Sequence, residues 1–298
     1  MSSIYLLARS GNTLSRWTPR AARHLLGTSV GAASYFGWPS KRHVTRLNLA
    51  QVTGRSVDDP YVKYLAYTSW RNYGRYASDF MSFPHMDIEY IDRNLRDLSE
   101  GERGWQGHMQ TALQAGRGAL FVTAHFGNWD LAGAILAHHH PLSAITETFN
   151  DAQLNQLLQG QRREKGIGII PMESSLRPIF RILQQNEFVA IVADRPLAEN
   201  RGIEVTFFGR KTYVPGGPAA LAFKTGAAIV PGFVWYGHNN EFYTKVFTPI
   251  FPQQGKNIDR DTEISRLTQS IYDHLEVMIR EWPSQWYMFR QFWPSENA

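Results

Sequence analysis

The sequence of 298 residues contains no cysteine. This absence excludes disulfide bonds, thiolate nucleophiles, cysteine-ligated zinc and iron–sulfur clusters, and it leaves the redox compartment undetermined. Hydrophobic residues make up 43% of the chain, which is enough for a substantial core, so global disorder is also excluded. We therefore predict a folded protein whose chemistry depends on side chains other than cysteine.

Acidic residues are missing from positions 1–57, which carry eight basic ones: Arg9, Arg16, Arg20, Arg23, Lys41, Arg42, Arg46 and Arg55. The other 23 of the 31 Lys and Arg residues share the rest of the chain with all 26 Asp and Glu residues. A basic arm on a slightly acidic body predicts an anionic partner, either a membrane surface or nucleic acid.

Long apolar runs are also missing. No stretch reaches the 18 or so apolar residues that a transmembrane helix requires, and no clear secretory signal begins the chain. An Arg-rich start resembles a transit peptide as well, but here the segment is continuous with the rest of the chain. Several apolar side chains alternate with the arginines, as in helices that lie among lipid headgroups: Ile4, Leu6, Leu7, Trp17, Leu25 and Leu26. Packing of the same helices on the protein's own core is an alternative that is compatible with this one.

We predict two parts: basic amphipathic membrane-facing helices over 1–58 and a catalytic domain over 59–298. The second part begins with a helix over 60–82 that has an aromatic stripe. Helices and strands then alternate, which predicts a layered α/β/α fold with a mixed, largely parallel central sheet. The expected strands are 119–124, 167–171, 188–193, 203–208, 227–236 and 242–247, and the expected helices are 104–114, 129–138, 151–165, 174–186, 215–224 and 260–281.

A histidine, His125, directly follows the first buried strand, at the sheet edge where open α/β folds place their sites. Acyl transfer to an alcohol needs a base for the hydroxyl proton, and imidazole titrates near neutral pH. Asp130, one helical turn further on, could orient the ring and stabilise the imidazolium. By itself this spacing is weak evidence, because a histidine at a sheet edge and an aspartate at a helix N-terminus are both common structural features.

Four ordered segments strengthen the interpretation, because together they resemble the bacterial lipid A biosynthesis acyltransferases and the related phosphatidylinositol mannoside acyltransferases. The similarity extends over roughly residues 100–295. The segments are His125-Phe-Gly-Asn-Trp-Asp130, Ala193-Asp194-Arg195-Pro196, Gly202-Ile-Glu-Val-Thr-Phe-Phe-Gly209 and Val214-Pro-Gly-Gly-Pro-Ala219, the last continuing through Thr225-Gly226-Ala227 to Pro231.

The resemblance implies transfer of a fatty acyl chain from acyl-carrier protein or coenzyme A to a hydroxyl of a membrane glycolipid, with no further cofactor. It assigns the general base to His125 and the orienting carboxylate to Asp130. The Asp194-Arg195 pair and Glu204 resemble the mannoside branch, where a glutamate pairs with the histidine, so Glu204 is a candidate second carboxylate. Two departures from the lipid A enzymes are Asp130 in place of their usual Glu and the lack of a membrane-spanning segment.

Further residues are predicted to bind substrate. Arg195 could hold a phosphate with its planar guanidinium or form an ion pair with Asp194. Gly216 and Gly217, before a helix, could offer backbone N–H groups to an anion. The remaining candidates are Asn128, inside the motif, and Arg162 and Arg163, at the end of a polar helix. We expect no metal site, and the three consecutive histidines 138–140 are interpreted as a solvated helix end.

We therefore predict a peripheral O-acyltransferase on the cytoplasmic face of the inner membrane, with the acyl donor, the glycolipid and an anionic membrane surface as partners. Acylation of a lysophospholipid or glycerol phosphate is the alternative reaction, although those enzymes usually have Pro-Glu-Gly where this chain has Pro215-Gly-Gly. A catalytically silent membrane-binding protein is a further alternative. Nucleic acid is not expected as a partner, because the slightly acidic body lacks a basic surface for it.

Overall fold

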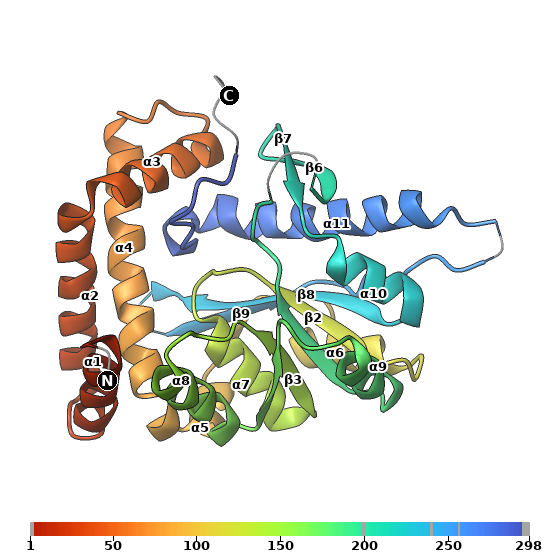
Figure 1. The fold of residues 1–298 in the computed structure, drawn as a ribbon, viewed down its shortest axis with the longest axis horizontal. Helices are drawn as coiled ribbons and strands as arrows, with labels where there is room; N and C mark the ends of the chain where they lie inside the picture. Colours follow the sequence, from red (N-terminus) through yellow and green to blue (C-terminus); the bar gives the residue numbers. More distant parts are fainter. Residues whose placement is uncertain (1–2, 198–200, 239–240, 256, 294–298) are drawn as a thin grey trace.

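Seven strands form the central sheet of the computed structural model, which describes the chain except for residues 1–2, 198–200, 239–240, 256 and 294–298 (Figure 1). The sheet has the order β1-β9-β8-β2-β5-β3-β4, and all neighbouring strands except the β8–β9 pair run parallel. The strands are β1 (Arg96–Asp97), β2 (Ala119–Thr123), β3 (Leu142–Thr146), β4 (Ile167–Pro171), β5 (Phe188–Val192), β8 (Ala228–Tyr236) and β9 (Phe242–Val246).

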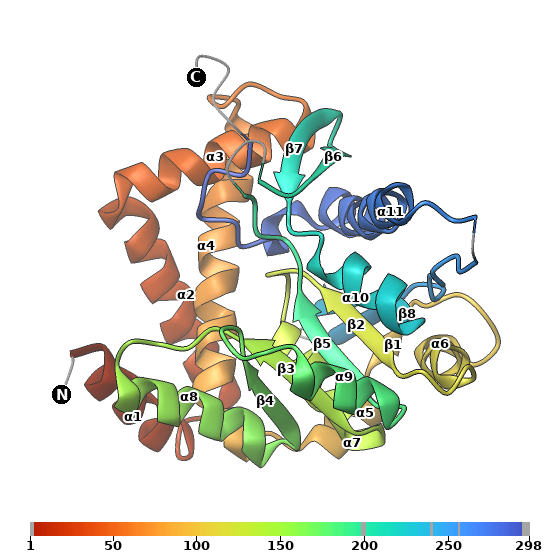
Figure 2. The ribbon, with the colours of Figure 1, turned by 45° about the vertical axis from the view of Figure 1, so that its right-hand side comes forward.

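Helices cover both faces of this sheet, as Figures 1 and 2 show. Alternate residues of β2 point to opposite sides. On one side Phe121 joins a core with Leu131 of α7 (Trp129–His139), and on the other Leu120 joins a core with Leu267 of α11 (Arg260–Glu281). The predicted layered α/β/α fold is confirmed. The helices of this part are α5 (Ile88–Arg93), α6 (Gly104–Leu113), α7 (Trp129–His139), α8 (Ala152–Glu164), α9 (Arg177–Gln184), α10 (Gly217–Thr225) and α11 (Arg260–Glu281).

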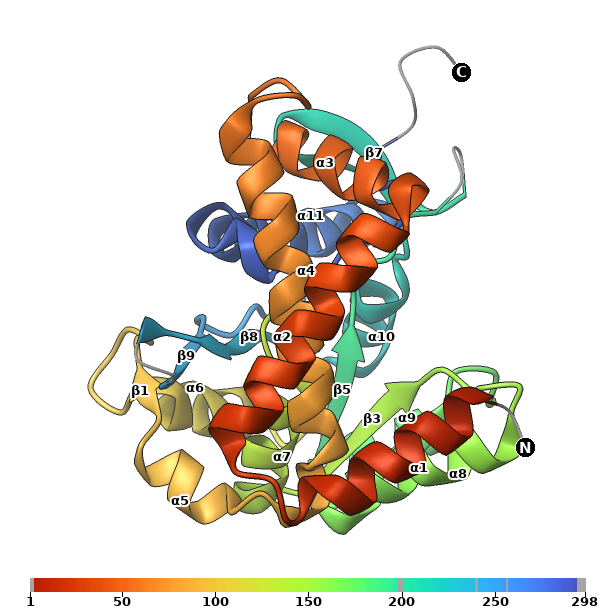
Figure 3. The same cartoon turned by 90° about the vertical axis from the view of Figure 1, so that its left-hand side faces the viewer.

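Four N-terminal helices stand beside the sheet: α1 (Ser3–Ser15), α2 (Arg20–Gly37), α3 (Pro39–Thr53) and α4 (Pro60–Met81). Figure 3 shows α2 crossing in front of α4. The two helices touch through glycines, since a Cβ atom at Gly74 would lie 2.0 Å from the carbonyl oxygen of Gly27. The aromatic stripe of α4 is divided: Trp70, Tyr76 and Phe80 are buried, whereas Tyr61, Tyr64 and Tyr73 are exposed.

One predicted strand lies outside the central sheet. Strand β6 (Ile203–Phe207) pairs antiparallel with β7 (Arg210–Val214) in a separate two-stranded sheet. The two residues between them, Phe208 and Gly209, have φ angles of 51° and 72°, as a tight hairpin turn requires. The segment that carries Glu204 therefore lies outside the sheet whose strands lead to His125.

Candidate active site

The segment after β2 is a tight turn that places His125 at the carboxyl end of the central strand. Gly127 in this turn has a φ of 56°, and a Cβ atom there would lie 2.3 Å from the carbonyl oxygen of Val234. The C-terminal segment holds the turn in place, because Tyr287 N–H donates to the carbonyl oxygen of His125 at 2.8 Å and Phe126 forms an antiparallel bridge with Trp286. The turn geometry therefore depends on residues more than 150 positions away in the sequence.

The imidazole of His125 is held by Asp194, which follows the adjacent parallel strand β5. Its Nδ1 lies 2.7 Å from Asp194 Oδ1, and its backbone N–H donates to Asp194 Oδ2 at 3.0 Å. Trp286 Nε1–H donates to the same Oδ2 at 2.9 Å. A carboxylate at Nδ1 fixes the tautomer with the proton on that nitrogen, which leaves Nε2 as the acceptor.

Asp194 is completely buried, yet it remains suited to be an anion. Burial by itself would raise the pKa of this carboxyl group. The charge of His125 and the hydrogen bonds from His125 and Trp286 outweigh burial, and they leave the pKa of Asp194 below its usual value. An ionised carboxylate in this position would stabilise the imidazolium that forms when His125 takes up a proton.

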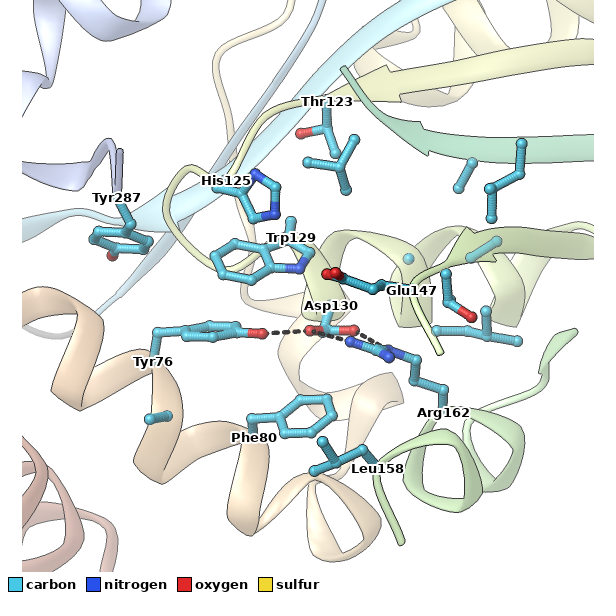
Figure 4. A pocket seen from close by; sticks show the side chains of 18 of the residues that line it. Tyr76, Phe80, Thr123, His125, Trp129, Asp130, Glu147, Leu158, Arg162 and Tyr287 are labelled. Carbon is cyan, nitrogen blue, oxygen red and sulfur yellow. Dashed lines mark hydrogen bonds and ion pairs between the residues drawn. The ribbon is translucent and has the colours of Figure 1, made fainter. Parts of the chain in front are cut away.

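A cavity of about 520 Å³ opens beside His125 and extends between the sheet, α4, α7 and α8 (Figure 4). Its wall is largely apolar, with a small polar group near the histidine, which is the usual character of a small-molecule binding site. The apolar residues include Phe80, Phe121, Ala144, Leu154, Leu158, Ile167 and Ala190. His125 is 27% exposed through its side chain, so a ligand in the cavity can reach the ring.

Asp130 lines the same cavity but has other partners than the predicted one. Arg162 Nε–H donates to Asp130 Oδ1 at 2.7 Å, and the Tyr76 hydroxyl donates to Asp130 Oδ2 at 2.5 Å. Figure 4 shows Trp129 between this group and His125. The ring of Trp129 stacks on Tyr76 at a centroid distance of 3.9 Å and meets the edge of His125 at 5.3 Å. The predicted contact of Asp130 with a ring nitrogen of His125 is therefore wrong. Asp194, and not Asp130, contacts Nδ1 of the ring.

Glu204 does not lie beside His125 either. Its carboxylate faces solvent on the β6–β7 hairpin, where Lys211 Nζ donates to it at 2.7 Å and the Tyr213 hydroxyl donates at 3.1 Å. These two hydrogen bonds lower the pKa of Glu204. The predicted pairing of Glu204 with His125 is therefore wrong. The carboxylate that pairs with His125 is that of Asp194.

Arg195 lies at the rim of the cavity, as a phosphate-binding residue would. Its guanidinium pairs with Glu147, which directly follows β3, at a distance of 2.6 Å. Both side chains are partly exposed and both line the cavity. The alternative ion pair of Arg195 with Asp194 does not form, because Asp194 faces His125 and Trp286.

The remaining predicted residues lie elsewhere or have structural contacts. Asn128 is buried and caps α7, accepting from Leu131 N–H at 3.1 Å. Gly216 caps α10 and packs on Ile203, and neither Gly216 nor Gly217 lines the cavity.

Arg163 is exposed on the outer side of α8, whereas its neighbour Arg162 lines the cavity and is the inward-facing one of the pair. In the described part of the chain, no group of three His, Asp or Glu side chains could hold a metal ion.

Sequence reasoning missed three residues of the site: Asp194 as the partner of His125, Trp286 as its second donor, and Glu147 at the rim. A signal existed for Asp194, because it directly follows a strand just as His125 does, and parallel strands end at the same edge of a sheet. No such signal existed for Trp286, which reaches the site from the far end of the chain.

Comparisons with known proteins show which family the chain resembles. The model of the family described as bacterial lipid A biosynthesis acyltransferase matches residues 4–295. A phosphatidylinositol mannoside acyltransferase of Mycolicibacterium smegmatis is 29% identical over 95% of this chain and 89% of its own length. A protein of the same name from Mycobacterium tuberculosis is 31% identical over 88% of this chain and 80% of its own length.

Proposed function

The chain belongs to the bacterial lipid A biosynthesis acyltransferase family, and within that family we propose that it transfers a fatty acyl chain from acyl-coenzyme A or acyl-carrier protein to a hydroxyl of a phosphatidylinositol mannoside type glycolipid. One observation carries the proposal: His125 is held at Nδ1 by the buried Asp194 and borders a large apolar cavity. A base beside a lipid-sized cavity suits an acyl thioester whose chain lies in the cavity.

The reaction needs no protein nucleophile. His125 Nε2 takes the proton of the acceptor hydroxyl while its oxygen attacks the thioester carbonyl carbon and forms the new C–O bond. The imidazolium that results is stabilised by the Asp194 carboxylate. When the tetrahedral intermediate collapses, the C–S bond breaks and His125 returns the proton to the leaving thiolate. The products are the ester and the free thiol, and the enzyme is unchanged.

The rim of the cavity suits the polar part of the donor. Arg195 and Glu147 form an ion pair there that is 31% and 49% exposed through its side chains. An exposed ion pair contributes little to stability, so a phosphate can replace the carboxylate as the partner of Arg195. The phosphates of coenzyme A or of the carrier-protein prosthetic group would supply such an anion.

The direct test incubates the purified protein with radiolabelled acyl-coenzyme A or acyl-carrier protein and three acceptors: a phosphatidylinositol mannoside, a lipid A precursor and a lysophospholipid. We expect labelled mannoside with the wild-type protein and no product with His125→Ala, which lacks the base. Label in the lysophospholipid alone would support the alternative reaction. Transfer that continues unchanged in His125→Ala would refute the mechanism.

The membrane side of the proposal is supported by the outer surface of α1 and α2 (Figure 3). Leu25, Leu26 and Val30 on α2 are 63–68% exposed, and Trp17 between the helices is 80% exposed. Exposed arginines of the same segment, Arg9 and Arg16, complement the charge of anionic lipids. The side chains of Ile4 and Leu7, predicted for this surface as well, lie outside the described residues. None of the described helices is both long and apolar enough to cross a bilayer.

The other side of α1 borders the candidate site, because Ala8 lines the cavity together with Met81 of α4. Helix α1, on which Leu6 and Leu14 are exposed, therefore also forms part of the cavity wall. A glycolipid acceptor could reach His125 from the membrane without leaving the lipid layer entirely. We accordingly propose that α1 and α2 hold the cavity mouth at the membrane surface.

A triple variant, Leu25→Ser, Leu26→Ser and Val30→Ser, is expected to weaken binding to anionic vesicles at least tenfold. The loss follows from removing three apolar groups that would insert among the lipid headgroups. Vesicle co-sedimentation measures the binding, and raised salt should weaken it in the wild-type protein. Point variants suit this test better than truncation, because His24 of α2 pairs with the buried Asp79 at 2.7 Å.

The matched control is Val277→Ser, a change at an exposed apolar residue of α11 on another part of the surface. It should leave vesicle binding unchanged. Equal binding by the triple variant and the wild-type protein, at low and high salt, would show that this surface does not contact the membrane.

A further inference from the structure

The inner wall of the cavity is a regular pattern of rows across the sheet. Phe121 of β2 is in register with Ala190 of β5, which is in register with Ala144 of β3. The row above, closer to His125, contains Thr123 and Val192. Because side chains two residues apart point to the same face, both rows face the same side of the sheet and line the same cavity.

The row below these two closes the cavity. It consists of Ala119, Phe188 and Leu142, in register across the same three strands. Ile167 of β4, in register with Leu142, continues the row and lines the cavity. Phe188 is 0% exposed and Leu142 is 3% exposed, and neither lines the cavity. Strands advance about 3.3 Å per residue, so the floor lies between about 13 and 20 Å from the level of His125, that is, between the levels of Phe121 and Ala119.

Small side chains create the lower part of this space. Ala144 and Ala190 lie in the middle of the sheet and beneath a helix, yet both are partly accessible, because the cavity lies over them. Opposite them, α7 contributes Gly133, and a Cβ atom there would lie 3.2 Å from Ile167 Cδ1. A glycine inside a helix costs about 1 kcal/mol relative to alanine. Nothing about helix α7 itself requires a glycine, whereas the cavity does gain space from it.

We propose that Gly133, with Ala144 and Ala190, sets the longest acyl chain that the enzyme accepts. This inference rests on the proposed acyl transfer at His125 and adds its chain-length specificity. The thioester lies at His125, the chain descends over the Thr123 row and the Ala190 row, and its terminal methyl group lies above the row of Phe188. A larger side chain at any of the three positions raises the floor and excludes the last carbons of the chain.

The expected size of the effect follows from the burial of methylene groups. Each buried methylene contributes about fourfold to binding. A side chain that displaces two methylenes from the cavity should therefore change the ratio of kcat/KM between a long and a shorter donor by about tenfold or more.

The experiment measures kcat/KM for saturated acyl-coenzyme A donors from octanoyl to stearoyl, with Gly133→Ala, Gly133→Leu and Ala190→Leu. We expect Gly133→Ala to prefer a shorter acyl chain than the wild-type enzyme, and Gly133→Leu to prefer a still shorter one. Ala190→Leu should also prefer a shorter chain than the wild-type enzyme. Alanine at position 133 favours the helix, but its Cβ atom would lie 3.2 Å from Ile167 Cδ1, so Ile167 must shift by a few tenths of an ångström. Leucine fills more of this space and is expected to lower the melting temperature. Ala190→Leu answers the question independently if Gly133→Leu does not fold.

The matched control is Gly160→Leu, the same substitution in the neighbouring helix α8, where a Cβ atom would meet nothing within 4 Å and the residue does not line the cavity. It should keep the wild-type chain preference. If the wild-type enzyme transfers acyl chains but the folded variants keep its preference, the chain-length inference is wrong while the proposed function stands. If the wild-type enzyme transfers no acyl chain of any length to any acceptor, the proposed function itself fails.

Discussion

Asp194→Asn is expected to lower kcat by about 10⁴-fold, with little change in KM. An asparagine in this position no longer selects the tautomer with a proton on Nδ1, and it cannot stabilise the imidazolium of His125. The magnitude is the one that the same substitution produces in Ser-His-Asp hydrolases. Asparagine has nearly the same shape and can still accept from Trp286 Nε1, so the protein should remain folded. Steady-state kinetics with the labelled donor measures both constants.

Glu204→Gln provides the matched comparison, because it neutralises a carboxylate that the sequence suggested as a partner of His125. The Glu204 side chain is 44% exposed and pairs with side chains of its own hairpin. The kcat of Glu204→Gln should therefore stay within about twofold of the wild-type value. The pair of variants distinguishes the two carboxylates directly. A large loss in Glu204→Gln together with a normal kcat in Asp194→Asn would mean that the geometry described for His125 is not the catalytic one.

Asp130→Asn is expected to lower the free energy of unfolding by about 3 kcal/mol. The change leaves the cation of Arg162 without its counter-charge in a mostly buried position, and removing one partner of a buried ion pair typically costs this much. The hydrogen bond from Tyr76 would also weaken. Urea unfolding followed by tryptophan fluorescence measures the difference, and a lower midpoint with an unchanged slope identifies a loss of stability.

Activity should fall in the same variant for a different reason from that in Asp194→Asn. We propose that Asp130 is a positioning residue that acts on His125 through Tyr76 and the stacked ring of Trp129. A modest loss of kcat that recovers in Asp130→Glu would fit this role. The control for stability is Asp261→Asn, which breaks an exposed ion pair with Arg260 and should leave the unfolding curve almost unchanged. Equal stability of Asp130→Asn and the wild-type protein would contradict the buried pair.

Most elements of the fold could be predicted from the sequence. The strand over 119–124 and the helices over 60–82 and 260–281 have long, regular apolar patterns, and the structure places β2, α4 and α11 there. Three strands were missed: β1, β3 and β7. Strand β3 has the mixed sequence Leu-Ser-Ala-Ile-Thr, and its three middle residues are only partly buried, so its apolar pattern is weak. Missing β3 also meant missing Glu147, which follows it.

The sequence alone determined the family, the alternation of strands and helices, and the position of His125 at the end of a buried strand. These properties follow from ordered motifs and local apolar patterns. Only the tertiary structure decided which carboxylate holds the histidine. The spacing to Asp130 was short along the chain, but α7 turns that side chain towards Tyr76 and Arg162, and the parallel pairing of β2 with β5 brings Asp194 to the ring instead. Distance across a sheet is set by strand order and register, and the spacing of two residues along the chain determines neither.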